Sequence, residues 1–261
     1  MAKCDRTPVE TIAFDAGVLL GESQRVVDLV REYLVRSECK LLWKQSTYGR
    51  VFSLAALSHE CMVLDQLNLG CRANFPTMIM GLLSRHHLET WLTGMYLLEG
   101  GSEALELFLG ESRRSKEALH KKIKELQATG RAIDVPDPPC ENNTWESKRW
   151  NLETVAKELE RLGEGTGRVK GVLEAYHRVY RTLSGSHGGH PTHQVLDSYI
   201  DTTRGFAYIL TEPQAHTLHR ELLQWSTVLT ASHAVLALGD LGLPTVEFSN
   251  TIQSLLPAKS A

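Results

Sequence analysis

The chain has 261 residues, of which 42% are hydrophobic and 23% charged. This composition is typical of a globular protein and excludes a mostly disordered chain, a collagen-like fibre and a disulfide-stapled miniprotein. Lys and Arg number 28 and Asp and Glu 31, giving a formal net charge of −3. The chain as a whole therefore offers no electrostatic reason to bind nucleic acid or an anionic membrane.

The cysteines and apolar segments indicate a cytoplasmic protein. There are five cysteines, an odd number without a C-x-x-C pair, which argues against a disulfide framework or a zinc knuckle. Asp15 interrupts the first apolar run, so we expect no signal peptide. We also expect no membrane partner, because 228–238 is too short to span and 78–98 carries four polar residues at its centre: Arg85, His86, His87 and Glu89.

Apolar residues recur at helical spacing along most of the chain, and Gly and Pro residues separate the periodic runs. We expect residues 1–22 to form a flexible or strapped tail, and residues 23–256 to form a single helical domain. The expected helices begin at Ser23 as a cap and continue, in chain order, with Arg50–Leu69, Asn74–Gly100, Ser102–Gly130, Thr144–Leu162, Thr166–Ser184, Pro213–Leu238 and Val246–Leu255.

Two segments depart from this pattern. Residues 131–143 are rich in Pro and Asn and predict a loop. Residues 197–210 contain aromatic and β-branched side chains and predict a short hairpin or an irregular insert. The predicted fold class is all-α, a bundle of about seven helices.

The helix expected at 74–100 holds the first candidate site. It is apolar on both sides, so we expect its charged residues Arg85 and Glu89 to be buried or to line a cavity. Four residues apart, they can pair with each other. Either they form a structural ion pair between helices, or they contribute to a substrate-binding site.

The second candidate site follows the helix expected at 166–184. Tyr180, Ser184 and His187 lie along one face, next to Gly185, Gly188 and Gly189 and the further histidines His190 and His193. Glycines let the backbone approach a ligand closely. Alternatively, they only cap the helix, and the histidines are solvated loop residues.

Two motifs carry a resemblance to known families. Arg85-x3-Glu89 and Tyr180-x2-Leu-Ser184-x2-His187 resemble a family of bacterial all-helical proteins of unknown function, which implies a fold and a shared pocket but no reaction. More remotely, the chain resembles the HEPN superfamily, many of whose members are metal-independent ribonucleases with an Arg-x(4–6)-His motif at a helix end. Arg181 to His187 has that spacing.

The HEPN resemblance implies a mechanism and a partner. His187 would act as general acid or base at the ribose 2′-OH, and Arg181 would stabilise charge on the phosphate. Tyr180 and Ser184 would support them, with no cofactor and with a homodimer bringing two motifs together. We therefore expect an RNA-cleaving or RNA-binding protein of a toxin or phage-defence system.

A basic stretch gives RNA binding a second, independent basis. Residues 113–124 contain six Lys and Arg side chains in twelve residues, which suits contact with a nucleic-acid backbone. Alternatively, the stretch is a solvated helix face, because acidic residues are interspersed: Glu111, Glu117 and Glu125.

Two other classes of function stay open. One is a non-catalytic helical module that binds a ligand or protein. The other is a di-iron enzyme, for which the pairs Glu117-x-x-His120 and Glu174-x-x-His177 would need further ligands from Glu60 or Glu89 and from Glu153 or Glu158. The dipeptides His59-Glu60 and His86-His87 are expected to be isolated, since a lone helical histidine is usually structural.

Overall fold

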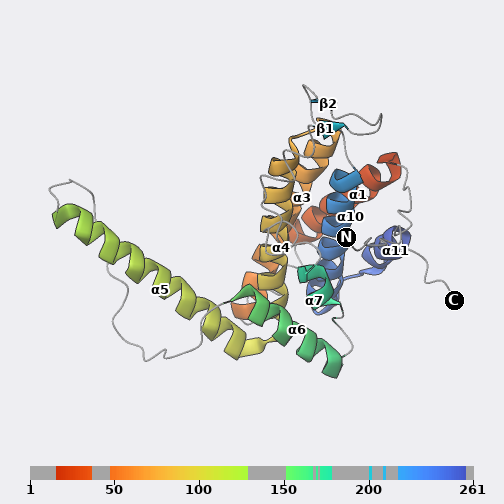
Figure 1. Cartoon of the computed structure of the whole chain (residues 1–261). Coiled ribbons are helices and arrows are strands. Elements are labelled where there is room, and N and C mark those ends of the chain that lie inside the picture. The colour runs from red at the N-terminus through yellow and green to blue at the C-terminus, as the bar shows by residue number, and fades with distance from the viewer. Residues whose placement is uncertain are drawn as a thin grey trace, which may run out of the picture.

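The computed structural model describes residues 16–36, 48–128, 151–166, 169, 171–177, 200–201, 208–209 and 217–256. It confirms the predicted all-α bundle (Figure 1). The described helices are α1 (Ala16–Val35), α3 (Tyr48–Arg72), α4 (Thr77–Glu99), α5 (Gly101–Ala128), α6 (Leu152–Thr166), α7 (Val172–Ala175), α10 (Thr217–Gly239) and α11 (Val246–Leu255).

The short link between α3 and α4 turns the chain back on itself. Asn74, expected as the cap of α4, has φ 52° and forms the left-handed turn. Pro76 is the residue that precedes the helix, with φ −52° and ψ 138°. At the other end, the N–H of Gly100 donates to the carbonyl of Tyr96, and Gly101 with φ 60° begins α5 directly.

The first helix begins earlier than expected. α1 starts at Ala16, so the prediction that Ser23 caps it is wrong. Ser23 is fully buried inside the helix, because the apolar stripe that continues through Val26 and Val30 already includes Leu19. Residues 16–22 therefore belong to the bundle, and the remainder of the expected tail lies outside the described residues.

Two helix starts in the second half also differ from expectation. α6 begins at Leu152 rather than Thr144, because the side chain of Asn151 accepts from the N–H groups of Glu153 and Thr154 at 2.9 and 3.3 Å. The next helix begins at Val172 rather than Thr166, since α6 still contains Thr166.

A side chain from α6 caps α7. The carboxylate of Glu160 accepts hydrogen bonds from three consecutive backbone N–H groups, those of Gly171, Val172 and Leu173, at 2.7–3.3 Å. A carboxylate at a helix N-terminus accepts hydrogen bonds from backbone N–H groups that lack a partner inside the helix, and it is attracted to the positive end of the helix dipole. Gly171 has φ 72°, a backbone conformation that favours glycine.

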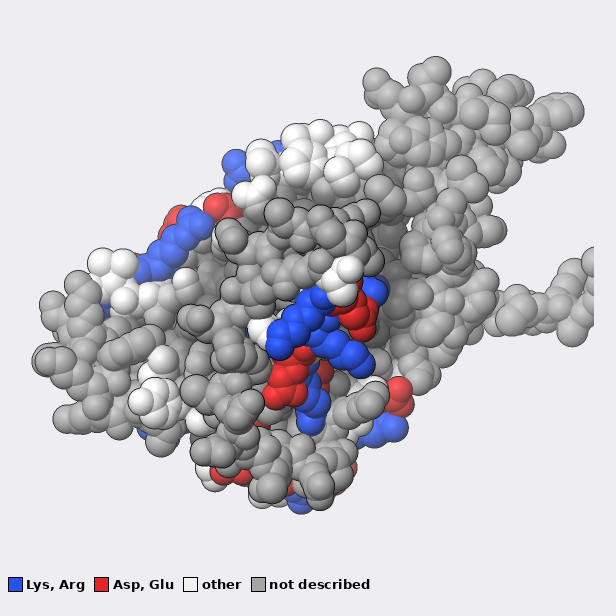
Figure 2. Space-filling model, turned by 90° about the vertical axis from the view of Figure 1, so that its left-hand side faces the viewer, with Lys and Arg blue, Asp and Glu red and all other residues white. Residues whose placement is uncertain are grey.

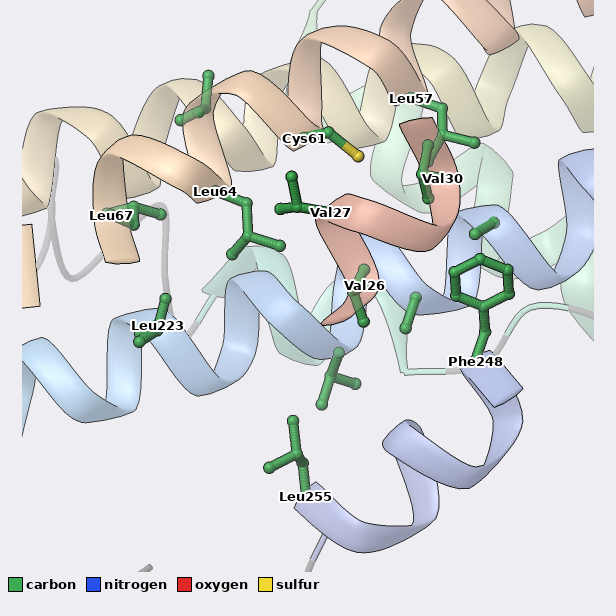
Figure 3. Close-up of a cluster of buried hydrophobic side chains, with 14 of the residues drawn as sticks. Val26, Val27, Val30, Leu57, Cys61, Leu64, Leu67, Leu223, Phe248 and Leu255 are labelled. Carbon is green, nitrogen blue, oxygen red and sulfur yellow. The ribbon is translucent and has the colours of Figure 1, made fainter. Parts of the chain in front are cut away.

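The hydrophobic core is built around α4 and α10. One cluster joins α1, α3, α10 and α11 through side chains such as Val27, Leu64, Leu223 and Phe248, which converge in Figure 3. A second cluster joins α4, α6 and α7 around Leu92 and also includes Leu229 of α10. α10 contributes to both clusters, and so does α4 through Met80, so these two helices are the central ones of the described bundle.

Length and apolar composition distinguish α10 from the other described helices. Among the described helices, only α10 has a stretch, His219–Gly239, that could cross a membrane by those two criteria, and 67% of its most apolar window is buried in the bundle. The central helix of a helical bundle has the same two properties.

The described residues in the second half of the chain include one small β element. β1 (Ile200–Asp201) and β2 (Tyr208–Ile209) pair antiparallel, with Ile200 opposite Ile209. Of the two alternatives expected near 197–210, a short hairpin or an irregular insert, this pairing agrees with the hairpin. The loop predicted at 131–143 lies outside the described residues.

α5 departs from the bundle. It is 28 residues long, or about 42 Å at the helical rise. Only its first part packs against α3 and α4, and its second half extends away from the other helices (Figure 1). We call residues 113–125 the α5 arm.

Candidate functional site

Most of the predicted site residues cannot be placed. Arg181, His187, Tyr180 and Ser184, which the HEPN resemblance singles out, lie outside the described residues, and so do His190 and His193. Among the described residues, other polar side chains come together between α3, α4 and α10.

The structure corrects the prediction for Arg85 and Glu89. They do form an ion pair, with Arg85 Nε 3.0 Å from Glu89 Oε1. Their side chains are 40% and 31% exposed, however, so the expected burial is wrong. The buried face of α4 runs through Ser84, His87 and Trp91 instead, and Arg85 and Glu89 lie beside it.

Three fully buried polar side chains form a chain of hydrogen bonds between α3 and α10. His233 Nε2 lies 2.8 Å from Ser53 Oγ, and His233 Nδ1 lies 2.7 Å from Glu60 Oε1. All three side chains have 0% exposure. Buried polar groups at this spacing hold two helices in one register, because any shift leaves them without partners.

A second buried contact joins α4 to the same helix. His87 Nε2 lies 2.7 Å from Thr230 Oγ1, and His87 is fully buried. Thr230 and His233 are three residues apart on α10, so one face of this helix meets both α3 and α4. We call Ser53, Glu60, His87, Thr230 and His233 the polar centre.

Burial sets the charge states of the polar centre. Loss of hydration raises the pKa of Glu60, an effect that the nearby His233 opposes. Loss of hydration also lowers the pKa of His87 to about 3, with His233 adding to the shift. Burial thus favours the neutral form of both groups, and a neutral Glu60 carboxyl would have an O–H that can donate to His233 Nδ1.

The order Ser53, His233, Glu60 is that of a hydrolase triad, but the surroundings exclude that chemistry in this conformation. A nucleophile must reach its substrate, and none of the three side chains is exposed. Gly94 of α4 also packs against the imidazole so closely that an added Cβ would lie 2.5 Å from His233 Cε1. The polar centre therefore has a structural role: its hydrogen bonds hold α3 and α4 against α10.

The neighbours of two polar-centre residues meet on the outer side of the same helix pair. His59 precedes Glu60 on α3, and His86 precedes His87 on α4. Their Nε2 atoms are 2.8 Å apart, and the rings lie edge to face at 83°. Burial and the neighbouring His86 lower the pKa of His59.

These contacts overturn the expectation that His59-Glu60 and His86-His87 are isolated. Each dipeptide sends one side chain inward to α10 and the other outward to its counterpart. One sequence signal for the inner contacts exists: Ser226, Thr230 and His233 follow each other at four- and three-residue spacing inside an apolar run.

The di-iron ligand sets do not assemble. No group of three or more His, Cys, Asp or Glu side chains suited to a metal occurs within the described ranges. Glu60 is hydrogen-bonded to His233, while Glu117 and His120 lie on the α5 arm. Ligands on the arm are too far from the core of the bundle to close a shared site.

The α5 arm presents the other notable surface. Blue lysine and arginine side chains gather at the centre of the face shown in Figure 2, with acidic side chains between them. A shallow, open depression is lined there by Glu117, His120, Lys121, Lys124 and Glu125. Their spacing along the chain puts these five residues on one side of the helix.

Comparisons of the chain with protein-family models, curated proteins and solved structures found no match.

Proposed function

We propose that the protein binds RNA and that the α5 arm is the surface that contacts the phosphates. The observation that carries the proposal is charge: the arm contains six Lys and Arg and two Glu, whereas the whole chain has a formal net charge of −3. A local excess of positive charge on an otherwise acidic protein directs a polyanion to that place.

The accessibility of the arm supports this proposal. The side chains of Lys116, Lys121, Lys122 and Lys124 are all exposed. Lys122 pairs with Glu125 at 3.0 Å, with the two side chains 69% and 51% exposed. Surface pairs of this kind contribute little stability, so a phosphate can replace the carboxylate.

The composition of the arm also indicates how RNA would be bound. Residues 113–125 include no Phe, Tyr or Trp on which a base could stack. Contacts restricted to phosphates give affinity that depends strongly on salt and weakly on sequence. The HEPN resemblance adds a cleavage pair, Arg181 and His187, which the arm would supply with substrate.

The test is binding of a fluorescent single-stranded RNA at several salt concentrations, in EDTA. The variant replaces Lys121, Lys122 and Lys124 with Gln. Its matched control replaces three paired surface cations, Arg25, Arg31 and Lys157, with Gln. Both variants lose three positive charges, so only the location of the charge differs.

We expect the arm variant to bind at least tenfold more weakly at low salt and to have a shallower salt dependence, by about 0.7 in log–log slope per lost phosphate contact. The control should bind within about twofold of the unmodified protein. Equal loss in both variants, or none in either, contradicts the proposal.

The same samples test cleavage. RNA recovered after long incubation is sized on a gel, beside a parallel incubation with the His187→Ala protein. Fragments made by the unmodified protein and absent with His187→Ala support a metal-independent ribonuclease. Intact RNA in both restricts the function to binding.

A further inference from the structure

The contact between His59 and His86 is the starting point for a second site. The two residues come from adjacent helices, α3 and α4, and their Nε2 atoms are 2.8 Å apart. His59 is half-buried and His86 is exposed, so solvent reaches the pair. The pair lies away from the α5 arm, and nothing in the RNA-binding proposal uses it.

We propose that His59 and His86 bind a divalent transition-metal cation that prefers imidazole nitrogen, such as Zn²⁺, Cu²⁺ or Ni²⁺. Two neutral imidazoles facing each other through Nε2 offer two lone pairs, and water would complete the coordination. In the metal-free pair one Nε2 carries the hydrogen that joins the two nitrogens. When the cation binds, this ring loses the Nε2 hydrogen to water and gains one at Nδ1, so it stays neutral and both Nε2 atoms present a lone pair.

The distance between the rings suits this role. With metal–nitrogen bonds of about 2.0–2.1 Å, two cis ligands at a right angle have nitrogens about 2.9 Å apart, and two tetrahedral ligands about 3.4 Å apart. The observed separation is 2.8 Å. The cation would lie beside the line that joins the two nitrogens, so both imidazoles turn their Nε2 lone pairs toward it when it binds.

The backbone on both sides of the pair is held in place. Glu60, next to His59, is hydrogen-bonded to His233, and His87, next to His86, is hydrogen-bonded to Thr230. Both ligands thus project from helices anchored to α10, and little freedom is lost when a cation bridges them.

The site should be selective by chemistry but moderate in affinity. Two protein ligands provide less binding free energy than the three or four of a dedicated zinc centre. Among divalent ions, Cu²⁺ should bind most tightly. Mg²⁺ and Ca²⁺ prefer oxygen ligands and should not bind at this pair.

The experiment measures metal binding by the full chain without an affinity tag. Protein stripped with EDTA and exchanged into chelator-free buffer is titrated calorimetrically with ZnCl₂, CuCl₂ or MgCl₂. The variants are His59→Gln and His86→Gln, which keep a polar side chain at each position. The control is His120→Gln, which removes a partly exposed histidine from the α5 arm.

We expect the unmodified protein and the control to bind one Zn²⁺ or Cu²⁺ and no Mg²⁺, and each pair variant to bind at least tenfold more weakly. Thermal unfolding gives a second readout, because a cation that bridges α3 and α4 raises the melting temperature of the unmodified protein and of the His120→Gln control, but not of the two pair variants. Circular dichroism verifies that all variants are helical.

Two results overturn the proposal. In one, the unmodified protein binds no Zn²⁺ or Cu²⁺. In the other, His59→Gln and His86→Gln retain full affinity and stoichiometry, which places the cation at other histidines. RNA binding is measured in EDTA, so failure of one proposal is recognised independently of the other.

Discussion

The polar centre and the α5 arm both contain several ionisable side chains, but these are buried in the centre and exposed to solvent on the arm. In the polar centre the side chains of Glu60, His87 and His233 have 0% exposure, and each is hydrogen-bonded to a partner on another helix. On the arm the lysines are exposed. Burial favours neutral groups with fixed partners, whereas water keeps charges available to a ligand.

This difference predicts that substitutions in the centre change stability and that substitutions on the arm change binding. The largest effect is expected for His233→Ala. Removing the buried imidazole leaves Glu60 and Ser53 without their partner and opens a cavity between α3 and α10. Together these effects should lower the free energy of unfolding by about 3–5 kcal/mol. Urea unfolding at neutral pH measures the change.

Glu60→Gln is the matched variant for that experiment. A glutamine amide can donate to His233 Nδ1 as the neutral carboxyl does, so we expect a loss of only about 1 kcal/mol. A loss as large as that of His233→Ala shows instead that Glu60 is ionised and forms an ion pair with a protonated His233.

The second prediction concerns acid. The pKa of His87 is about 3 in the folded protein and about 6.5 when unfolded. Between these values the unfolded state binds the proton and the folded state does not, so stability falls as the pH falls. The loss is about 1.4 kcal/mol per pH unit, or about 2 kcal/mol from pH 6.5 to pH 5.

Glu60 acts in the opposite direction, because its raised pKa makes the folded state hold a proton that the unfolded state releases. The measurement therefore compares urea unfolding of the unmodified protein with that of His87→Gln at both pH values. We expect the variant to lose about 2 kcal/mol less than the unmodified protein over this interval. Parallel pH profiles of the two proteins would falsify the assignment to His87.

The smallest effect is expected for Glu89→Gln. Its partner Arg85 is 40% exposed, and the two residues form an i, i+4 pair on the helix surface. Such pairs stabilise a helix by about 0.2–0.5 kcal/mol at low salt. The difference in urea midpoint should disappear in 1 M NaCl, because salt screens exposed charges. A decrease of more than about 2 kcal/mol in the free energy of unfolding would indicate instead that Arg85 and Glu89 form a buried ion pair.

The fold could be predicted because its signals are local. Helical periodicity and the Pro76 and Gly100 boundaries predicted α4 closely, and the last helix was predicted with the bounds that the structure shows. Ser23 was misjudged because a serine inside a helix and one that caps it look alike in sequence. Only packing against the core distinguishes them.

The site was harder to predict because its contacts are distant along the chain. α4 is apolar on most sides, so periodicity could not show that His87, rather than Arg85, faces α10. Glu60 and His233 are separated by 173 positions, and no local pattern relates them. The helical pairing of Arg85 with Glu89, by contrast, depended on spacing alone and was confirmed.

The long separation between the polar centre's partners has a consequence for synthesis of the protein. The hydrogen-bond partner of Glu60, His233, is synthesised 173 residues after it, and the partner of His87, Thr230, is synthesised 143 residues after it. While the chain grows from its N-terminus, α3 and α4 can form as helices, but their inner faces lack the helix that covers them. We therefore expect the α3–α4 pair to remain hydrated and dependent on chaperones until α10 has been translated.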